Sequence, residues 1–339
     1  MCAVENRRNT FALELGTVWN TTPTMETNSI VYPQSISGLI REIADEYSKG
    51  AGQGLIKQSV HGPDLPNSPN FMIWAEENGY IPLLLMAMHY ANDTLAGAGD
   101  PYTHTMIFQE VSPYFFGIVF EAADRYKALP SAMIDGITET YEGDAGVLTF
   151  AITAKGTTIS IVTSASLTYA TAKTKSQPFL MKNTTLWMNA QSGGALSSTN
   201  EIEVTDLVIT RPRPAATLHA TGNSVISQPI QGDFPEQTVT FKIPLTSAAQ
   251  KTAAETLYDA YIAETLQKME ITNSGTTANR VRKVYEPQVK LTKVDEPTED
   301  VIACVVEARL EVAAAAPTGM TQTASYMTWK CDTAASPLV

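Results

Sequence analysis

Residue types that commonly carry out catalysis or bind metals are few in this sequence and widely spaced. The histidines are His61, His89, His104 and His219, and the cysteines are Cys2, Cys304 and Cys331. No histidine stands at ligand spacing from another histidine, a cysteine or a carboxylate, as a zinc site requires. An odd set of distant cysteines forms neither a zinc ribbon nor a dense disulfide framework. The Gly-x-Ser-x-Gly motif of serine hydrolases is absent. We therefore expect no catalytic residue, no metal site, no cofactor and no enzymatic activity.

Two short motifs resemble functional motifs at first sight, and both have simpler structural explanations. Gly50-Ala-Gly-Gln-Gly54 has the composition of a phosphate-binding loop, but no strand precedes it and no Lys-Ser or Lys-Thr follows at the required spacing. Arg211-Pro-Arg-Pro214 is the one compact basic motif, and its alternating prolines are typical of an extended connection. We interpret the first as a loop and the second as a structural link. Acidic pairs such as Glu76-Glu77 are expected on the solvated surface.

Composition and charge exclude several classes of protein. The 339 residues are 44% hydrophobic and 17% charged, which is enough apolar material for one or two cores and too little charge for a disordered acidic chain. The formal net charge of −12 opposes binding to nucleic acid through its phosphates. The longest apolar run, residues 81–88, is far shorter than the roughly 20 residues of a membrane-spanning helix. Since no signal peptide is apparent either, we expect a soluble protein made in a cytoplasm, without membrane contact.

Alternating runs rich in β-branched residues predict a mainly β fold with a few helices. Strands are predicted at residues 132–140, 147–153, 157–163, 203–210, 238–243 and 301–312. Short strands separated by turn residues are typical of antiparallel sandwiches or barrels. Helices are predicted at residues 37–50, 83–91 and 246–269, the last starting at Thr246 or Ser247. The fold class is therefore mainly β (α+β), with helices that flank the sheets.

The two halves of the sequence show a similar order of elements. Residues 132–140 and 147–153 form one predicted strand–turn–strand unit, and residues 201–209 and 238–243 form a second. A helix is predicted near each unit. The polar stretch 170–178 between them has the composition of a junction. We predict two domains, residues 1–172 and 173–339, and hypothesise that the second duplicates the first.

Several short motifs occur in an order that covers almost the whole chain. They lie at residues 11–17, 26–29, 54–57, 81–91, 100–105, 133–137, 146–150, 238–243 with the Ala-rich helix that follows, and 285–287. In these motifs and their order the chain resembles the major tail tube proteins of long-tailed, non-contractile bacteriophages. It departs from that family at residues 106–108, which lack a proline that often follows the His-Thr pair. The proline-rich segment 211–231 is also longer than the family pattern.

This resemblance implies a structural virion protein that assembles into stacked rings around a channel for the genome. It implies tandem β-sandwiches of the tail-tube type, with long loops between subunits. Double-length members of the family form trimeric rings of pseudo-sixfold symmetry, so we expect a trimer, with a true hexamer as the alternative. Further expected partners are the tape measure, terminator and distal tail proteins. DNA is expected to pass without specific binding, and the protein to reside in the virion tail after assembly in the host cytoplasm.

Candidate functional residues follow from this expected assembly. The acidic candidates for the channel surface are Glu139, Glu142, Asp144, Glu201 and Glu203, because a negative bore repels phosphate. An acidic outer surface is the alternative explanation for these residues. The candidates for contacts between subunits are Trp19, Tyr32, Phe71 and Trp74. Segments 17–34 and 50–70 are long, rich in proline and poor in periodicity, so we predict that one or both reach a neighbouring ring.

Other functions use the same type of fold. Aromatic residues in loops could bind a carbohydrate or a receptor by stacking, as in a tail-tip protein or adhesin, and the candidates are Trp19, Tyr32, Trp74 and Trp187. We favour contacts between subunits as their role. A hydrolase whose site has no recognisable motif is the third alternative. Electron microscopy separates the first two functions, because only a tube protein forms rings or tubes.

Overall fold

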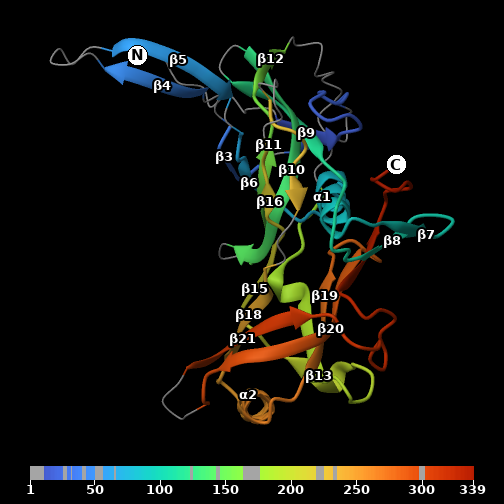
Figure 1. Ribbon diagram of the computed structural model, residues 1–339. Coiled ribbons are helices and arrows are strands. Elements are labelled where there is room, and N and C mark those ends of the chain that lie inside the picture. The colour runs from blue at the N-terminus through green and yellow to red at the C-terminus, as the bar shows by residue number, and fades with distance from the viewer. Residues whose placement is uncertain are drawn as a thin grey trace, which may run out of the picture.

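The computed structural model describes residues 11–25, 29–31, 33–39, 43–49, 56–64, 66–122, 125–142, 146–162, 176–218, 225–231, 235–297 and 302–339. The protein is mainly β, with 49% strand and 13% helix, which confirms the predicted fold class. Its strands run through an elongated body, and one hairpin projects from an end of it (Figure 1).

Most strands are short, and β10 and β20 are the longest. In the first part of the chain the elements are β1 (Phe11–Leu15), β2 (Ile30–Val31), β3 (Ser35–Ser37), β4 (Ile43–Lys49), β5 (Ile56–Asp64), β6 (Asn70–Trp74), α1 (Tyr80–Tyr90), β7 (Thr94–Ala96), β8 (Tyr102–Ile107), β9 (Phe116–Ala122), β10 (Arg125–Glu142), β11 (Val147–Gly156) and β12 (Ser160–Val162). In the second part they are the 3-10 helix η3 (Met181–Asn183), β13 (Thr184–Ala190), the 3-10 helix η4 (Ser198–Asn200), β14 (Glu201–Ile202), β15 (Asp206–Pro212), β16 (Ala215–Ala216), β17 (Ile230–Gln231), β18 (Gln237–Pro244), α2 (Ala248–Ile262), β19 (Gln267–Ser274), β20 (Val281–Val294), β21 (Ala303–Glu311) and β22 (Tyr326–Cys331).

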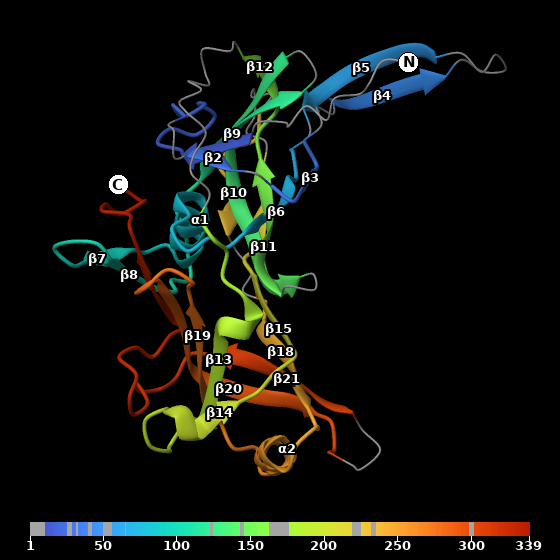
Figure 2. The ribbon, with the colours of Figure 1, turned by 180° about the vertical axis from the view of Figure 1, so that it is seen from behind.

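One antiparallel series of strands, called the main sheet here, runs the length of the body. Its order is β3–β6–β11–β10–β15–β18–β21–β20. A second series pairs in the order β13–β19–β20–β22–β8–β7, and a third in the order β2–β1–β9–β10. The long strands β10 and β20 therefore each belong to two series and connect them. Figures 1 and 2 both place α1 between β10 and the β7–β8 hairpin.

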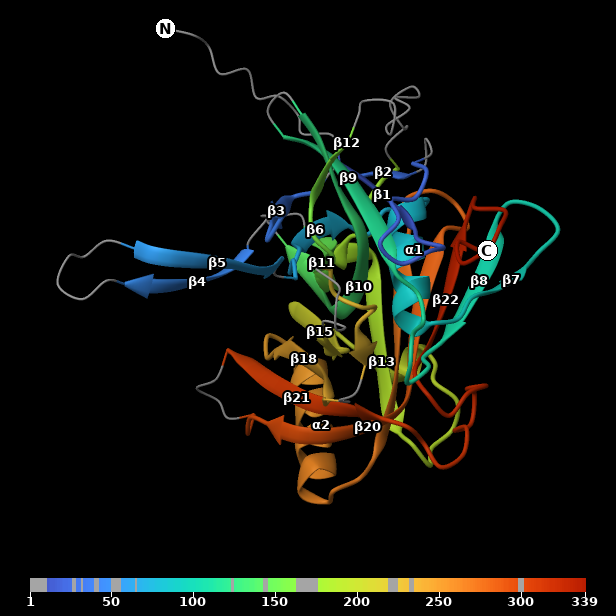
Figure 3. The same cartoon turned by 45° about the horizontal axis from the view of Figure 1, so that its top comes forward.

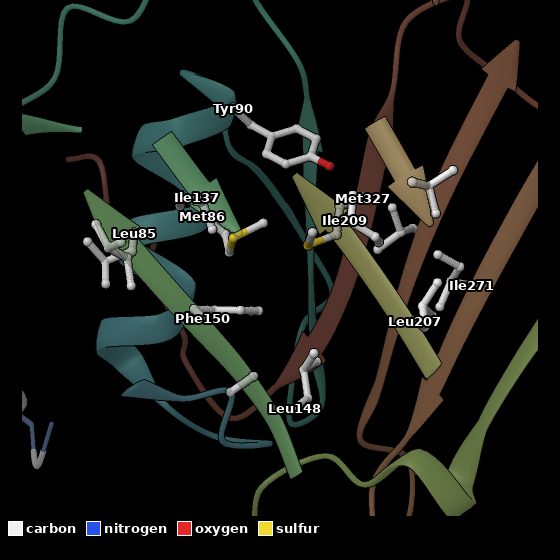
Figure 4. Close-up of a cluster of buried hydrophobic side chains, with 14 of the residues drawn as sticks. Leu85, Met86, Tyr90, Ile137, Leu148, Phe150, Leu207, Ile209, Ile271 and Met327 are labelled. Atoms are coloured by element: carbon white, nitrogen blue, oxygen red, sulfur yellow. The ribbon is translucent and has the colours of Figure 1, made fainter. Parts of the chain in front are cut away.

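The hydrophobic core lies between these series of strands, and α1 is buried in it. The residues of α1 are apolar on every side of the helix, which is typical of a helix inside a core. In Figure 4, Leu85 and Met86 of α1 lie beside Ile137 of β10 and Phe150 of β11. The same cluster continues through β15 toward β19, so one core serves strands from both halves of the chain.

The predicted helices have three different outcomes. The helix at residues 83–91 is confirmed as α1. The helix near residue 246 begins as predicted, with the hydroxyl of Ser247 accepting a hydrogen bond from the Gln250 amide at 3.3 Å, but it ends at Ile262 and β19 follows. The helix at residues 37–50 is wrong, because β4 occupies most of that range and pairs with β5. Pairing with β5, in a segment predicted as a loop, overrides a weak helical pattern.

The predicted strands agree better with the structure. Those at residues 132–140, 147–153, 203–210, 238–243 and 301–312 are confirmed as β10, β11, β15, β18 and β21. Of residues 157–163, only Ser160–Val162 is a strand within the described part. The predicted domain boundary falls in residues 163–175, outside the described residues. Strands from the two sides of that boundary pair at β10–β15 and at β8–β22. The division into two domains stays a prediction.

Candidate functional site

The main sheet has one face on the core and one partly exposed outer face. Side chains alternate between the faces of a strand, and two rows cross β6, β11, β10, β15 and β18 on the outer face. The first row is Met72, Ala151, Thr138, Thr210 and Thr238, and the second is Trp74, Thr149, Thr140, Val208 and Thr240. Neither row contains a charged residue. Beside the second row, Asp206 of β15 lies opposite Lys242 of β18 on the same face, and the two form an ion pair at 2.7 Å. On the next strand, β21, Glu307 and Arg309 continue the two rows. These two rows are therefore uncharged and rich in threonine, and a paired acid and base border them.

Glu139 does not lie on the outer face, so its prediction as a channel residue is wrong. It shares the inner face of β10 with Ile137 and is buried. Its Oε1 accepts a hydrogen bond from Nη1 of Arg211 at 2.8 Å, and its Oε2 accepts one from Nη2 of Arg282. Two guanidinium groups thus replace the water that a buried carboxylate loses.

The same guanidinium groups extend a buried network across both halves of the chain. Nη2 of Arg211 donates to Oε1 of Glu286, whose Oε2 accepts a hydrogen bond from the hydroxyl of Ser325. Nη1 of Arg282 donates to Oδ1 of Asn273 at 2.8 Å. With Glu139, the network holds two arginines and two glutamates and is formally neutral. In the basic motif at residues 211–214, Arg211 therefore has a structural role through buried ion pairs, and Arg213 donates a hydrogen bond to the carbonyl of Gln109.

Burial and charge shift the pKa values of groups in and around this network. Burial raises the pKa of Glu286, and the neighbouring Arg211 opposes that rise. Burial disfavours the charge of Arg211, but Tyr90, Glu286 and Glu139 outweigh it and hold the pKa of Arg211 above its usual range. Burial also raises the pKa of Tyr141 to about 12. Arg211 therefore keeps its charge, on which its ion pairs with Glu139 and Glu286 depend, at any ordinary pH.

The other acidic candidates do not gather on one surface. Glu142 is the last residue of β10, and Asp144 lies outside the described residues. Glu201 and Glu203 are exposed at β14 and just after it. The carboxylate of Glu203 accepts a hydrogen bond from the Gln250 side chain in the first turn of α2. The described acidic candidates thus form no continuous lining.

The aromatic candidates for contacts between subunits divide into two groups. Phe71 is buried in the core of its own chain, so its prediction as a contact between subunits is wrong. Trp19 is already engaged within the chain, since its indole Nε1 donates to the carbonyl of Ile226 at 3.0 Å. Trp74 is exposed on the outer face of the main sheet, where a neighbouring molecule can reach it. Tyr32 lies outside the described residues.

The β4–β5 hairpin is the most prominent projection of the molecule. It forms a separate two-stranded sheet, without pairing to any other described strand. Figures 1 and 3 show it extending away from the body. An isolated two-stranded hairpin is at best marginally stable in water, so a projecting hairpin needs further contacts. The predicted arm at residues 50–70 lies partly in this hairpin. In the other predicted arm, residues 17–34, Met25, Ser29 and Ile30 are buried against their own chain.

Glu77 is buried and forms contacts that the sequence does not predict, since the acidic pair at residues 76–77 is expected on the surface. Its carboxylate accepts hydrogen bonds from the backbone N–H groups of Thr276 at 2.5 Å and Thr277 at 3.1 Å, in the turn between β19 and β20. Its carbonyl accepts a hydrogen bond from the indole of Trp329 at 3.2 Å. The partner at Thr276 lies 199 residues along the chain, so no local pattern marks this contact.

His104 forms a second buried contact, at the base of the β7–β8 hairpin. Its Nδ1 lies 3.1 Å from Oδ2 of Asp93, and its Nε2 lies 3.0 Å from the carbonyl oxygen of Thr333. Both partners accept hydrogen bonds, so only the imidazolium, which donates from both nitrogens, satisfies them. Burial lowers the pKa of His104, but Asp93 and Cys331 outweigh it and raise that pKa to about 10. The ion pair holds His104 in place, and the hydrogen bond from its Nε2 to the carbonyl of Thr333 attaches the C-terminal tail to β8.

No protein-family model matches the sequence, and the search of curated proteins found no match. Within the described residues, no group of three or more His, Cys, Asp or Glu side chains is placed to hold a metal ion. In that same part of the chain, no helix combines the length and the apolar character needed to cross a membrane. Function is therefore inferred from the geometry and from the sequence motifs.

Proposed function

We propose that this protein is the tail tube subunit of a long-tailed, non-contractile bacteriophage and assembles into stacked rings around a channel for DNA. The β4–β5 hairpin carries this proposal, because it projects from the body and pairs with no other described strand (Figure 3). Such a hairpin gains stability when a second molecule packs against it. In a homopolymer every copy both offers a hairpin and receives one, so a single feature generates a repeating assembly.

The outer face of the main sheet supports the channel part of the proposal. Its two rows consist of threonine with a few apolar residues and carry no charge. The uncharged rows offer no cation to bind phosphate, and the neighbouring Lys242 is paired with Asp206, so DNA passes along this face without being held. This face, in place of the acidic surface expected from the sequence, lines the proposed channel. The buried helix α1 lies on the opposite side of the sheet and faces away from the channel.

The proposed ring is a trimer of pseudo-sixfold symmetry, with a true hexamer as the alternative. One chain contributes strands from both its halves to the main sheet, through the β10–β15 pairing. Each chain therefore supplies two sections of the channel wall, and three chains supply six. In the virion tail the proposed neighbours are the tape measure, terminator and distal tail proteins.

Electron microscopy of the purified protein tests the proposal. Incubation at increasing protein concentration is expected to give rings or tubes, with threefold rotational symmetry in averaged images. A variant in which Asn-Gly replaces residues 47–59 closes β4 and β5 through a two-residue turn after the Glu46–Val60 pair. This shortened-hairpin variant is expected to stay folded by circular dichroism and to form no tubes.

A matched control keeps both strands and replaces only residues 50–55 by Asn-Gly. Lys49 and Ile56 still pair in this variant, so it is expected to assemble. A wild-type protein that remains monomeric at every concentration would contradict the tube function. Normal tubes from the shortened-hairpin variant would contradict the role of the hairpin. Sixfold symmetry in the images would replace the trimer by the hexamer.

A further inference from the structure

Two sets of strands, one in each half of the chain, pair among themselves in the same pattern. In this comparison the set in the first half is called the first series and the set in the second half is called the second series, independently of the sheet to which they belong. In the first series β1 pairs with β2 and β9, β6 with β3 and β11, and β10 with β9, β11 and β12. In the second series β13 pairs with β14 and β19, β18 with β15 and β21, and β20 with β19, β21 and β22. All these pairs are antiparallel. The β4–β5 hairpin comes between β3 and β6 in the chain, and the β16–β17 hairpin comes between the corresponding strands β15 and β18. Helix α1 follows β6, and helix α2 follows β18.

Irregularities in the long strands coincide as well. The register of β10 shifts around Pro130 and again at Asp135, which is passed over in the pairing with β11. The register of β20 shifts around Pro287 and again at Thr292, which is passed over in the pairing with β21. Placing Pro287 on Pro130 therefore brings both bulges into agreement. Bulges are specific features of a strand, so two that coincide argue for a common plan.

The registers also match individual residues of the two series. The matched core pairs are Phe71 with Phe241 and Ile73 with Ile243, and all four side chains are buried. The backbone N–H of Ala75 donates to the carbonyl of Leu148, and that of Leu245 donates to the carbonyl of Ile302, both at 2.9 Å. The counterpart of β10–β11 is thus β20–β21, and not the strands at residues 201–243 expected from the sequence.

One junction joins the two series inside the main sheet. β10 pairs there with β15, and Thr140 lies opposite Val208. Because β20 corresponds to β10 and β3 corresponds to β15, an equivalent junction would join β20 to β3. These strands do not meet within the chain. They stand at the two ends of the main sheet (Figure 1). β3 has no described partner strand opposite β6, and residues 290–294 of β20, beyond the end of its pairing with β19, have none opposite β21.

β3 and β20 each end at the position where the corresponding strand, β15 or β10, begins to pair at the junction inside the chain. β15 runs on past Val208 along β10, whereas β3 ends at the corresponding residue, Ser37. β10 runs on past Ile137 along β15, whereas β20 ends at the corresponding residue, Val294. A strand without a neighbour leaves its outward N–H and C=O groups unpaired, so the missing lengths are those that a partner would stabilise.

Apolar side chains are exposed at these edges and buried at the junction inside the chain. Ile36 of β3 corresponds to Leu207 of β15, and their exposed fractions are 38% and 2%. Ile302, just before β21, corresponds to Leu148, and their exposed fractions are 84% and 1%. Figure 4 shows Leu148 and Leu207 within the core cluster. The exposed isoleucines therefore occupy core positions that lack a neighbour.

We propose that β20 of one copy pairs with β3 of the next copy, an inference that rests on the proposed self-assembly and names its contact. The occupant of each free edge is a second copy of this chain, in a head-to-tail arrangement that continues the main sheet from molecule to molecule. Transfer of the β10–β15 register places Pro297 opposite Ser37 and Asp295 opposite Leu39. The same junction covers the two exposed isoleucines.

Cysteine cross-linking between copies tests this junction. One variant carries Ser37→Cys and a second carries Pro297→Cys, so neither holds both halves of the expected cross-link. When the two are mixed under oxidising conditions, we expect a covalent 37–297 dimer, identified by mass spectrometry of the linked peptides. The matched control is the double variant Thr140→Cys with Val208→Cys, which is expected to form the equivalent disulfide inside one chain.

The outcomes separate this junction from the tube function. The 37–297 dimer supports the junction, whereas cross-links of Ser37→Cys with itself overturn it, because they show a face-to-face contact. Rings in the electron microscope without the 37–297 dimer overturn the junction and leave the tube function standing. The dimer without stacked rings supports the junction and contradicts the tube function. If neither the 37–297 dimer nor rings form, the junction and the tube function are both contradicted. If the 140–208 disulfide of the control does not form, the register from which the pairing was derived is wrong.

Discussion

Two strand junctions, called seams here, join the first half of the chain to the second half, and they differ in their charges. At the β10–β15 seam, Glu139 of β10 binds Arg211 of β15, and both are buried. At the β8–β22 seam, the buried His104 of β8 forms an ion pair on its own side with Asp93, which precedes β7, and crosses the seam through a hydrogen bond to the carbonyl of Thr333. A guanidinium group stays charged at any ordinary pH, whereas an imidazolium loses its proton above its pKa. The ion pair at the β10–β15 seam therefore persists at any ordinary pH, whereas alkaline pH weakens the contacts of His104 at the β8–β22 seam.

The β8–β22 seam also shows how a neighbour decides which residues are buried. β22 corresponds to β12, and Met327 of β22 corresponds to Ile161 of β12. Met327 is fully buried beside β8, whereas 65% of Ile161 is exposed. The β7–β8 hairpin follows α1, but α2 leads directly to β19, so the described part of the chain has no counterpart of the β7–β8 hairpin after α2. Equivalent positions thus differ in burial because of what packs against them.

The largest effect on stability is expected at the β10–β15 seam. Glu139→Ala leaves Arg211 and Arg282 buried with one carboxylate fewer, and breaking a buried ion pair costs about 3–5 kcal/mol of unfolding free energy. Urea unfolding of the variant and the wild type measures this loss. The control Glu307→Ala removes an exposed partner of Lys293 and is expected to cost less than about 1 kcal/mol. Equally small losses in both variants would show that charge does not hold this seam.

A second, smaller loss is expected from the core next to that seam. Leu207→Ala removes a buried side chain of β15 and leaves a cavity, which lowers the free energy of unfolding by about 2–5 kcal/mol. The same urea experiment measures it. Leu207→Met, which conserves volume, is the control and is expected to cost less than about 1.5 kcal/mol. A cost of Leu207→Ala no larger than that of Leu207→Met would mean that this position is not packed in solution.

The pH dependence of the β8–β22 seam is expected to be smaller still. The pKa of His104 is raised to about 10 in the folded protein, above the value of about 6.5 of an unfolded histidine. The stabilisation is therefore fully present below about pH 6.5 and is lost as pH rises toward 10. Its size is that of a charged hydrogen bond, about 1.5–3 kcal/mol.

Unfolding free energies of the wild type and of His104→Gln, measured from pH 6 to pH 9.5, check this expectation. The difference between the two proteins should be largest at pH 6 and shrink as the pH rises. The groups that face His104 are Asp93 and Cys331. A difference that stays constant across this range would show that His104 is neutral in the folded protein.

How much of this structure the sequence predicts depends on how local each signal is. The strands β11, β18 and β21 and the cap at Ser247 follow from patterns within a few residues, and these predictions are confirmed. The helix at residues 37–50 is wrong because β4 exists only through its pairing with β5. A segment whose partner lies elsewhere in the chain cannot be assigned from its own periodicity.

The candidate site divides in the same way. Alternation along β10 places Glu139 on the same face as Ile137, so its inner position follows from the sequence. Its charge nevertheless indicated a surface, because the partner Arg211 lies 72 residues away. Glu77 has a partner 199 residues away and left no signal at all. The threonine rows of the outer face appear only once the strands of the main sheet are placed side by side.

The smallest effect on the stability of a single chain is expected at Ile36, the counterpart of Leu207. Ile36 is exposed at the edge of the main sheet, so Ile36→Ala is expected to change the free energy of unfolding by only about 0.5 kcal/mol. In the proposed junction the same side chain is buried by β20 of the next copy, so its loss weakens every contact between copies. Analytical ultracentrifugation is expected to show assembly at a roughly tenfold higher protein concentration, which corresponds to about 1.4 kcal/mol for each contact. Val111→Ala, at an exposed apolar residue between β8 and β9, is the control and should leave assembly unchanged. If Ile36→Ala assembles at the wild-type concentration, β3 stays open in the assembly and the difference between Ile36 and Leu207 has another cause.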